Sequence, residues 1–155
     1  MGPLTYKVFI SYKRLTGEDF AIFLREGLEN EGISAFLDVQ DIPKKFDGKR
    51  KWWKYRDDAL VHSEVFLLVI TDGIENSGEV GKEVEMATER SMQCIYLRHR
   101  GLNTRAVLNL TKRKLDLGDF EQTEFDTKQD LLRKVLRIVR QESPKKGAPV
   151  RPQDT

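Results

Sequence analysis

Residues 64–71 read EVFLLVIT, a continuous apolar run that decides the fold class. A strand with one wet face alternates apolar and polar residues, whereas a strand covered on both faces is apolar throughout. The run is far shorter than the roughly 20 apolar residues that a membrane span requires. It therefore predicts a central strand of a parallel sheet that is covered by helices on both sides.

The segments on either side of this run alternate between strand and helix patterns. Short β-branched or aromatic runs predict further strands at 6–12, 33–39, 93–99 and within 113–120. Apolar residues at helical spacing predict helices after the turn at 14–19 and at 52–63, 77–92 and 128–141. Such alternation implies right-handed crossovers and a doubly wound, five-stranded parallel sheet of the α/β class.

Two local signals predict where the first helix begins and ends. Thr16 is followed three residues later by Asp19, which is the spacing of a capping box at a helix start. Gly32 follows the helix and is expected to take the left-handed conformation that ends it. The helix at 128–141 is amphipathic, and its expected inward stripe consists of Leu131, Leu132, Val135, Leu136 and Val139.

Length and composition indicate one domain, residues 1–142, followed by a proline-rich tail, 143–155, that we expect to be disordered. The net charge is only +2, so global charge predicts no membrane or polyanion partner. The single cysteine, Cys94, fits a reducing compartment, and we expect a cytoplasmic location. His62 and His99 have no His or Cys partner at metal-ligand spacing, so no metal site is predicted.

The candidate site follows from the expected topology. Doubly wound sheets bind ligands at the carboxyl ends of their strands, beside the point where the strand order reverses. In a flavodoxin-like order the first and third strands flank this point, so the loops at 13–19 and 72–78 should meet there. The helix at 77–92 begins at the same edge of the sheet.

Three glutamates of this helix are not equivalent. Glu83 adjoins the expected inward stripe, Glu79 lies one turn earlier, and Glu85 lies on the far, solvated side. A carboxylate at the edge of an apolar stripe can stabilise a positively charged transition state or bind sugar hydroxyls. The alternative is a set of solvated acids that suit the helix dipole, and the local pattern leaves both interpretations open. The expected inward stripe of the helix at 77–92, which Glu83 adjoins, consists of Val80, Val84, Ala87 and Ser91.

Four segments, in order and at fitting separations, resemble those of one known family. They are YKVFISYKR (6–14), EGISAFLDVQDIP (31–43), ALVHSEVFLLVIT (59–71) and NSGEVGKEVEMA (76–87). Across residues 6–142 the chain resembles a TIR (Toll/interleukin-1 receptor) domain. The combination of FISYKR with FLDV is similar to the NAD-cleaving branch, which includes microbial TIR proteins and the animal axon-degeneration NADase.

The resemblance implies a flavodoxin-like fold and cleavage of the nicotinamide–ribose bond of NAD⁺, which is a substrate and not a cofactor. The family's catalytic glutamate falls on Glu83. Its other substrate contacts fall on the basic pair Lys13 and Arg14, on Asp38, and on Phe46 of the so-called BB loop. The chain departs from the family in one respect, because the tryptophan expected four residues before the glutamate is replaced by Glu79.

Residues 44–56, KKFDGKRKWWKYR, hold seven basic residues interleaved with four aromatic ones. Three interpretations remain open. The segment is a solvated loop with Trp52 or Trp53 in the core, a self-assembly surface as the resemblance implies for the BB loop, or a single-strand nucleic-acid site. The near-neutral chain disfavours nucleic acid. The two functions carried forward are an NAD⁺ glycohydrolase active on self-association and a non-catalytic TIR interaction module.

Overall fold

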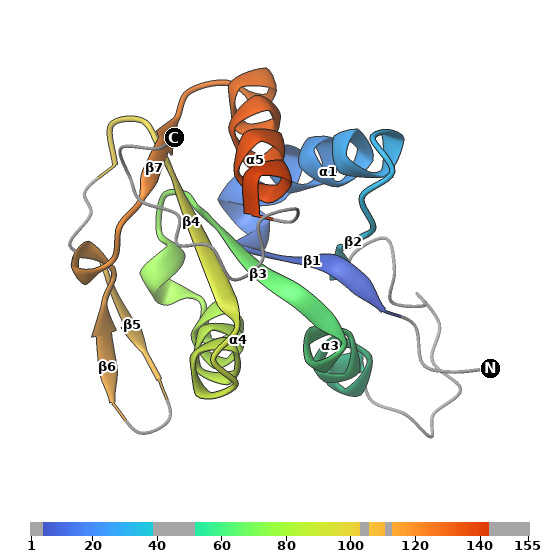
Figure 1. Cartoon of the computed structure of the whole chain (residues 1–155). Helices are drawn as coiled ribbons and strands as arrows, with labels where there is room; N and C mark the ends of the chain where they lie inside the picture. The colour runs from blue at the N-terminus through green and yellow to red at the C-terminus, as the bar shows by residue number, and fades with distance from the viewer. Residues whose placement is uncertain (1–4, 39–51, 103–105, 111–112, 143–155) are drawn as a thin grey trace.

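The computed structural model describes residues 5–38, 52–102, 106–110 and 113–142. Its centre is a five-stranded parallel sheet in the order β2-β1-β3-β4-β7 (Figure 1). The strands are β1 (Tyr6–Tyr12), β2 (Ala35–Phe36), β3 (Ser63–Ile70), β4 (Gln93–His99) and β7 (Thr123–Phe125). The doubly wound, flavodoxin-like fold predicted from the sequence is thereby confirmed.

In the described part of the chain, four helices cover the two faces of the sheet (Figure 1). They are α1 (Arg14–Asn30) and α5 (Lys128–Glu142) on one face, and α3 (Trp52–Val61) and α4 (Gly78–Glu89) on the other. Alternate side chains of β3 enter the two cores, Val65, Leu67 and Val69 on the α1–α5 side and Phe66, Leu68 and Ile70 on the α3–α4 side. Double coverage of this strand is what its continuous apolar run predicted.

The helix pair α1–α5 packs closely because one contact residue lacks a side chain. A Cβ on Gly27 would overlap the Leu132 side chain. Of the predicted inward stripe of α5, Leu131, Val135 and Val139 are buried and the other two members are partly buried. The amphipathic pattern therefore predicted the buried face of this helix correctly.

The segment 113–120 holds a strand as predicted, but its predicted place as the fifth strand of the main sheet was wrong. That segment contains β6 (Lys114–Asp116), which pairs antiparallel with β5 (Val107–Asn109) outside the main sheet. The fifth strand of the main sheet is β7, which pairs with β4 and forms the edge opposite β2. Leu115 lies opposite Leu108, and both are buried in the α3–α4 core. Periodicity detected a strand there but not its partner.

The predicted start of α1 was also wrong. The helix begins at Arg14, directly after β1, and its N-cap residue Lys13 makes no side-chain cap bond. The Thr16 hydroxyl instead donates to the Asp72 carbonyl at 2.8 Å and lies 2.8 Å from Thr71 Oγ1. A contact to the loop after β3 therefore replaces the expected capping box.

The other predicted boundaries of helices and strands agree with the structure to within a few residues. β2 is shorter than the predicted strand at 33–39. Gly32 has φ +80°, which confirms the left-handed end of α1. α4 is capped by Ser77, whose Oγ accepts from the Val80 N–H at 3.2 Å, and it ends at Glu89. Ser91 consequently lies beyond the helix and is exposed, not part of the inward stripe.

The described residues also contain two short 3₁₀ helices, η1 (Ile74–Asn76) and η2 (Leu117–Asp119). No helix in the described part of the chain has both the length and the apolar character to cross a membrane. The expected tail, 143–155, lies outside the described residues.

Candidate functional site

A pocket of about 380 Å³ opens at the carboxyl end of β1, where the strand order reverses. Residues of β1, the start of α1, the segment after β2, and the N-cap and first turns of α4 enclose it. Its lining consists of Phe9, Ile10, Tyr12, Arg14, Asp38, Ser77, Glu79 and Glu83. Topology alone predicted a site at this edge.

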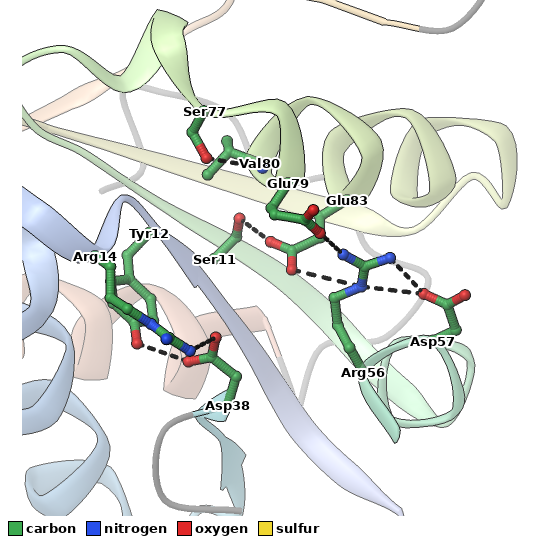
Figure 2. A network of polar contacts seen from close by, with 10 residues as sticks. All are labelled: Ser11, Tyr12, Arg14, Asp38, Arg56, Asp57, Ser77, Glu79, Val80 and Glu83. Atoms are coloured by element: carbon green, nitrogen blue, oxygen red, sulfur yellow. Dashed lines mark hydrogen bonds and ion pairs between the residues drawn. The ribbon is translucent and has the colours of Figure 1, made fainter. Parts of the chain in front are cut away.

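Glu83 is the buried acid of the pocket. Its residue is only 8% exposed, and Ser11 of β1, fully buried, donates from Oγ to Glu83 Oε1 at 2.6 Å (Figure 2). Ser11 follows Ile10 and precedes Tyr12, both in the α1–α5 core, so the alternation of the strand turns its hydroxyl toward α4. The carboxyl group is therefore held by two rigid elements.

Arg56 of α3 lies beside this acid. It is 5% exposed, and its Nε lies 3.8 Å from Glu83 Oε2. Its guanidinium also donates to Asp57 Oδ1, from Nη2 at 2.9 Å and from Nε at 3.1 Å, and it pairs with Glu79 through Nη1 (Figure 2). A buried arginine is thus surrounded by three carboxyl groups, which satisfies the requirement that a buried charge be paired.

The ionisation of Glu83 is set mainly by its burial. Desolvation raises the pKa of Glu83 to about 8, against the opposing effects of the Ser11 hydrogen bond and the Arg56 charge. The carboxylates of Asp38 and Glu79 act in the same direction as burial. The protein without ligand therefore holds Glu83 chiefly as the neutral acid at pH 7.

A second cluster forms the other side of the pocket. Tyr12 Oη donates to Asp38 Oδ1 at 2.6 Å, and Arg14 Nη2 lies 3.1 Å from Asp38 Oδ2. Burial, followed by the hydrogen bond to Asp38, raises the pKa of the Tyr12 phenol, so it stays a donor. The Arg14 side chain is 65% exposed, which leaves its charge accessible to an anion at the pocket mouth.

The structure brings together three of the five residues proposed from the sequence, Glu83, Arg14 and Asp38. Lys13 does not line this pocket, because its side chain runs over Gly73, with Cε 3.4 Å from the position that a Cβ would occupy there. Gly73 has φ +77°. Phe46 lies outside the described residues.

Three residues of the site were missed in the sequence. Ser11 and Tyr12 belong to the strand segment FISY. Because successive side chains of a strand point to opposite faces of the sheet, the segment could have predicted that these two point in opposite directions. Arg56 was counted in the basic segment 44–56, and no local pattern separates a buried arginine from its exposed neighbours.

Other chemically active side chains have structural partners. His62 Nδ1 lies 2.8 Å from the Asp58 carbonyl, and His99 Nε2 lies 3.1 Å from that of Asp126. Burial raises the pKa of the Cys94 thiol, which keeps it protonated. Among the described residues, no three His, Cys, Asp or Glu side chains are grouped so as to hold a metal ion.

The molecule is thus a doubly wound α/β domain with an acidic group buried at its switch-point pocket. The family model of the TIR domain matches residues 8–136, and the chain belongs to the TIR domain family. No curated protein matches it.

Solved structures that share the fold include the following three. The TIR domain of the Toll-related receptor TRR-2 from Hydra magnipapillata is 18% identical, with a TM-score of 0.63 over 88% of this chain and 99% of that domain. A metazoan TIR-STING receptor from C. gigas in complex with 2',3'-cGAMP is 16% identical, with a TM-score of 0.65 over 90% of this chain. A second structure of the C. gigas receptor is 18% identical, with a TM-score of 0.59 over 97% of this chain. This chain covers only 40% and 43% of those two receptor chains.

Proposed function

We propose that the protein is an NAD⁺ glycohydrolase that cleaves the nicotinamide–ribose bond and releases nicotinamide with ADP-ribose or a cyclic ADP-ribose. The observation that carries this proposal is the position of Glu83, a buried carboxyl group in the wall of a pocket of about 380 Å³. A pocket of this size accommodates part of a dinucleotide, with the remainder at the open mouth.

The charges of the pocket support one orientation of NAD⁺. The exposed guanidinium of Arg14 would pair with the diphosphate, and Lys13 would add charge at the outer end of the site. Asp38 is held by Tyr12 and Arg14, so its oxygens are oriented to accept from ribose hydroxyl groups. We propose a further substrate contact from Phe46.

Glu83 would act on the charge that develops in the reaction. When the C1′–N bond breaks, its electron pair leaves with nicotinamide, which departs as a neutral base because it was a pyridinium. Positive charge then spreads over the ribose ring, where a fixed carboxylate stabilises it. Water adds to C1′ and gives its proton to Glu83 or solvent, forming ADP-ribose; attack from within the dinucleotide gives the cyclic product. The reaction requires no cofactor.

The raised pKa of Glu83 fits this role once substrate is bound. A pyridinium beside the carboxyl group favours its ionised form, as any nearby cation does. Binding of the substrate would therefore generate the carboxylate that the reaction needs, while the free protein keeps the buried group largely neutral.

We further propose that activity requires self-association, which is common among TIR domains, and that it takes place in the cytosol. Trp53 is 41% exposed, and Lys54 Nζ lies 5.6 Å from its ring centroid, so an aromatic and cationic surface is available on α3. Arg56 is withdrawn from this surface into its carboxylate cluster. That arrangement favours a protein partner over nucleic acid.

A non-catalytic TIR interaction module is the second candidate function. The observation in its favour is Glu79, which stands where the resemblance places a tryptophan and offers no ring for stacking a base. The two candidates differ in one measurable respect, the release of nicotinamide.

The test is an incubation with NAD⁺, followed chromatographically, for wild type and Glu83→Gln. Glutamine keeps an oxygen that accepts from Ser11 but cannot ionise, so we expect the initial rate to fall by about a hundredfold or more. Glu89→Gln, at the exposed end of α4, is the matched control and should keep the wild-type rate. Absence of release at every protein concentration would leave the interaction module, and release that survives Glu83→Gln would refute the assignment of Glu83.

A further inference from the structure

The pocket is electrically polarised between its two clusters. On one side Arg14 pairs with Asp38 and keeps an exposed cation at the mouth. On the other side the lining comes from α4 and its N-cap, as Glu79, Glu83 and Ser77 (Figure 2). An elongated ligand with an anionic middle and a cationic end therefore has one favourable orientation, with the cationic end against α4.

Glu79 is fixed at this cationic end. It lies one helical turn before Glu83, lines the same pocket, and its Oε2 accepts from Arg56 Nη1. Arg56 is itself buried and bonded to Asp57, so it cannot follow Glu79 into solvent. The Glu79 side chain nevertheless stays 50% exposed, and it is accessible to a ligand in the pocket.

The charges of this cluster do not cancel. Arg56 contributes one positive charge, and Asp57 and Glu79 contribute one negative charge each, which leaves one negative charge before Glu83 is counted. A positive group is attracted to this end, whereas a group that carries its own carboxylate is repelled by it.

We propose that Glu79, oriented by Arg56, is a specificity-determining residue that selects substrates whose base is a pyridinium cation while it is attached to ribose, and rejects those whose base also carries a carboxylate. The preferred class is the N-ribosides of pyridinium bases with uncharged substituents. This inference rests on the proposed function, since it assigns the leaving base of that reaction to the α4 side of the pocket. At position 79, recognition of the base by the charge of Glu79 would take the place of stacking on the tryptophan that the resemblance expects there.

Binding measured without turnover tests the inference. In the Glu83→Gln background, calorimetry compares NAD⁺ with nicotinic acid adenine dinucleotide, which differ only in the carboxamide or carboxylate of the base. Because Glu79 is half exposed and screened by solvent, we expect NAD⁺ to bind about tenfold more tightly at low salt, and the ratio to fall as salt is added.

Variants at position 79 assign the preference to its charge. Glu79→Gln keeps an oxygen for Arg56 and should bring the ratio close to one, whereas Glu79→Asp keeps the charge and should retain most of the preference. Glu89→Gln, on the same helix about 15 Å away, should leave the ratio unchanged. Thermal unfolding of each variant identifies any loss of fold.

The outcomes separate this inference from the proposed function. Equal binding of the two dinucleotides, or a ratio that Glu79→Gln does not change, overturns the role of Glu79 even if nicotinamide is released. A ratio that depends on Glu79, together with no nicotinamide release by wild type, supports the selection and refutes the enzyme. If neither dinucleotide binds, the role of Glu79 is overturned, and the enzyme is refuted as well where wild type releases no nicotinamide.

Discussion

At the scale of single residues, the ionisation of Glu83 links stability to pH. Its pKa is about 8 in the folded protein and ordinary, near 4.5, in the unfolded chain. Between these values the folded state holds a proton that the unfolded state has lost, so stability falls as pH rises through this range. Each pKa unit corresponds to about 1.4 kcal/mol. Urea unfolding at pH 5 and pH 8.5 should show this loss in wild type and a much smaller one in Glu83→Gln; equal losses would contradict the raised pKa.

The same residue sets the expected pH dependence of activity. Because cleavage needs the carboxylate, kcat/KM should rise with pH until about pH 8. Ser11→Ala removes a hydrogen bond to the charged form, and the midpoint should move upward by about one pH unit. Thr88→Ala removes a hydroxyl of α4 that bonds only to the helix backbone in the described structure, and should leave the midpoint in place. A midpoint that Ser11→Ala does not move would exclude Ser11 as a positioning residue.

At the scale of elements, the contact between α1 and α5 depends on Gly27. Alanine is the better helix former, but its Cβ would overlap Leu132, and overpacking of this kind costs about 1–3 kcal/mol. We expect Gly27→Ala to lower the free energy of unfolding by roughly 1 kcal/mol. In a Leu132→Ala background the same substitution should be neutral or stabilising, and an unchanged penalty would refute the contact.

The elements also show what was predictable from the sequence. The run at 64–71 predicted β3 and its coverage on both sides because every inward position of a doubly covered strand must be apolar. The start of α1 was not predictable in this way, because Thr16 bonds to Asp72, 56 residues away, and not to its own helix. For the site, topology placed Glu83, but Arg56 reaches it from another helix, and such a pairing leaves no periodic signal.

At the scale of the whole molecule, the proposed self-association connects the pocket to a neighbouring surface. Leu15 is 86% exposed, the most exposed of the large apolar residues in the described part of the chain, and it follows Arg14 at the pocket mouth. A second copy that covered this mouth would bury Leu15 and exclude water from the charged groups of the pocket, strengthening their action on the substrate. Nicotinamide release per molecule should therefore rise with protein concentration, in step with assembly measured by sedimentation. Leu15→Lys should weaken both dependences without lowering the thermal unfolding midpoint, because the side chain has little to lose in the monomer. Specific activity that stays constant while sedimentation shows assembly would mean that one copy suffices for catalysis.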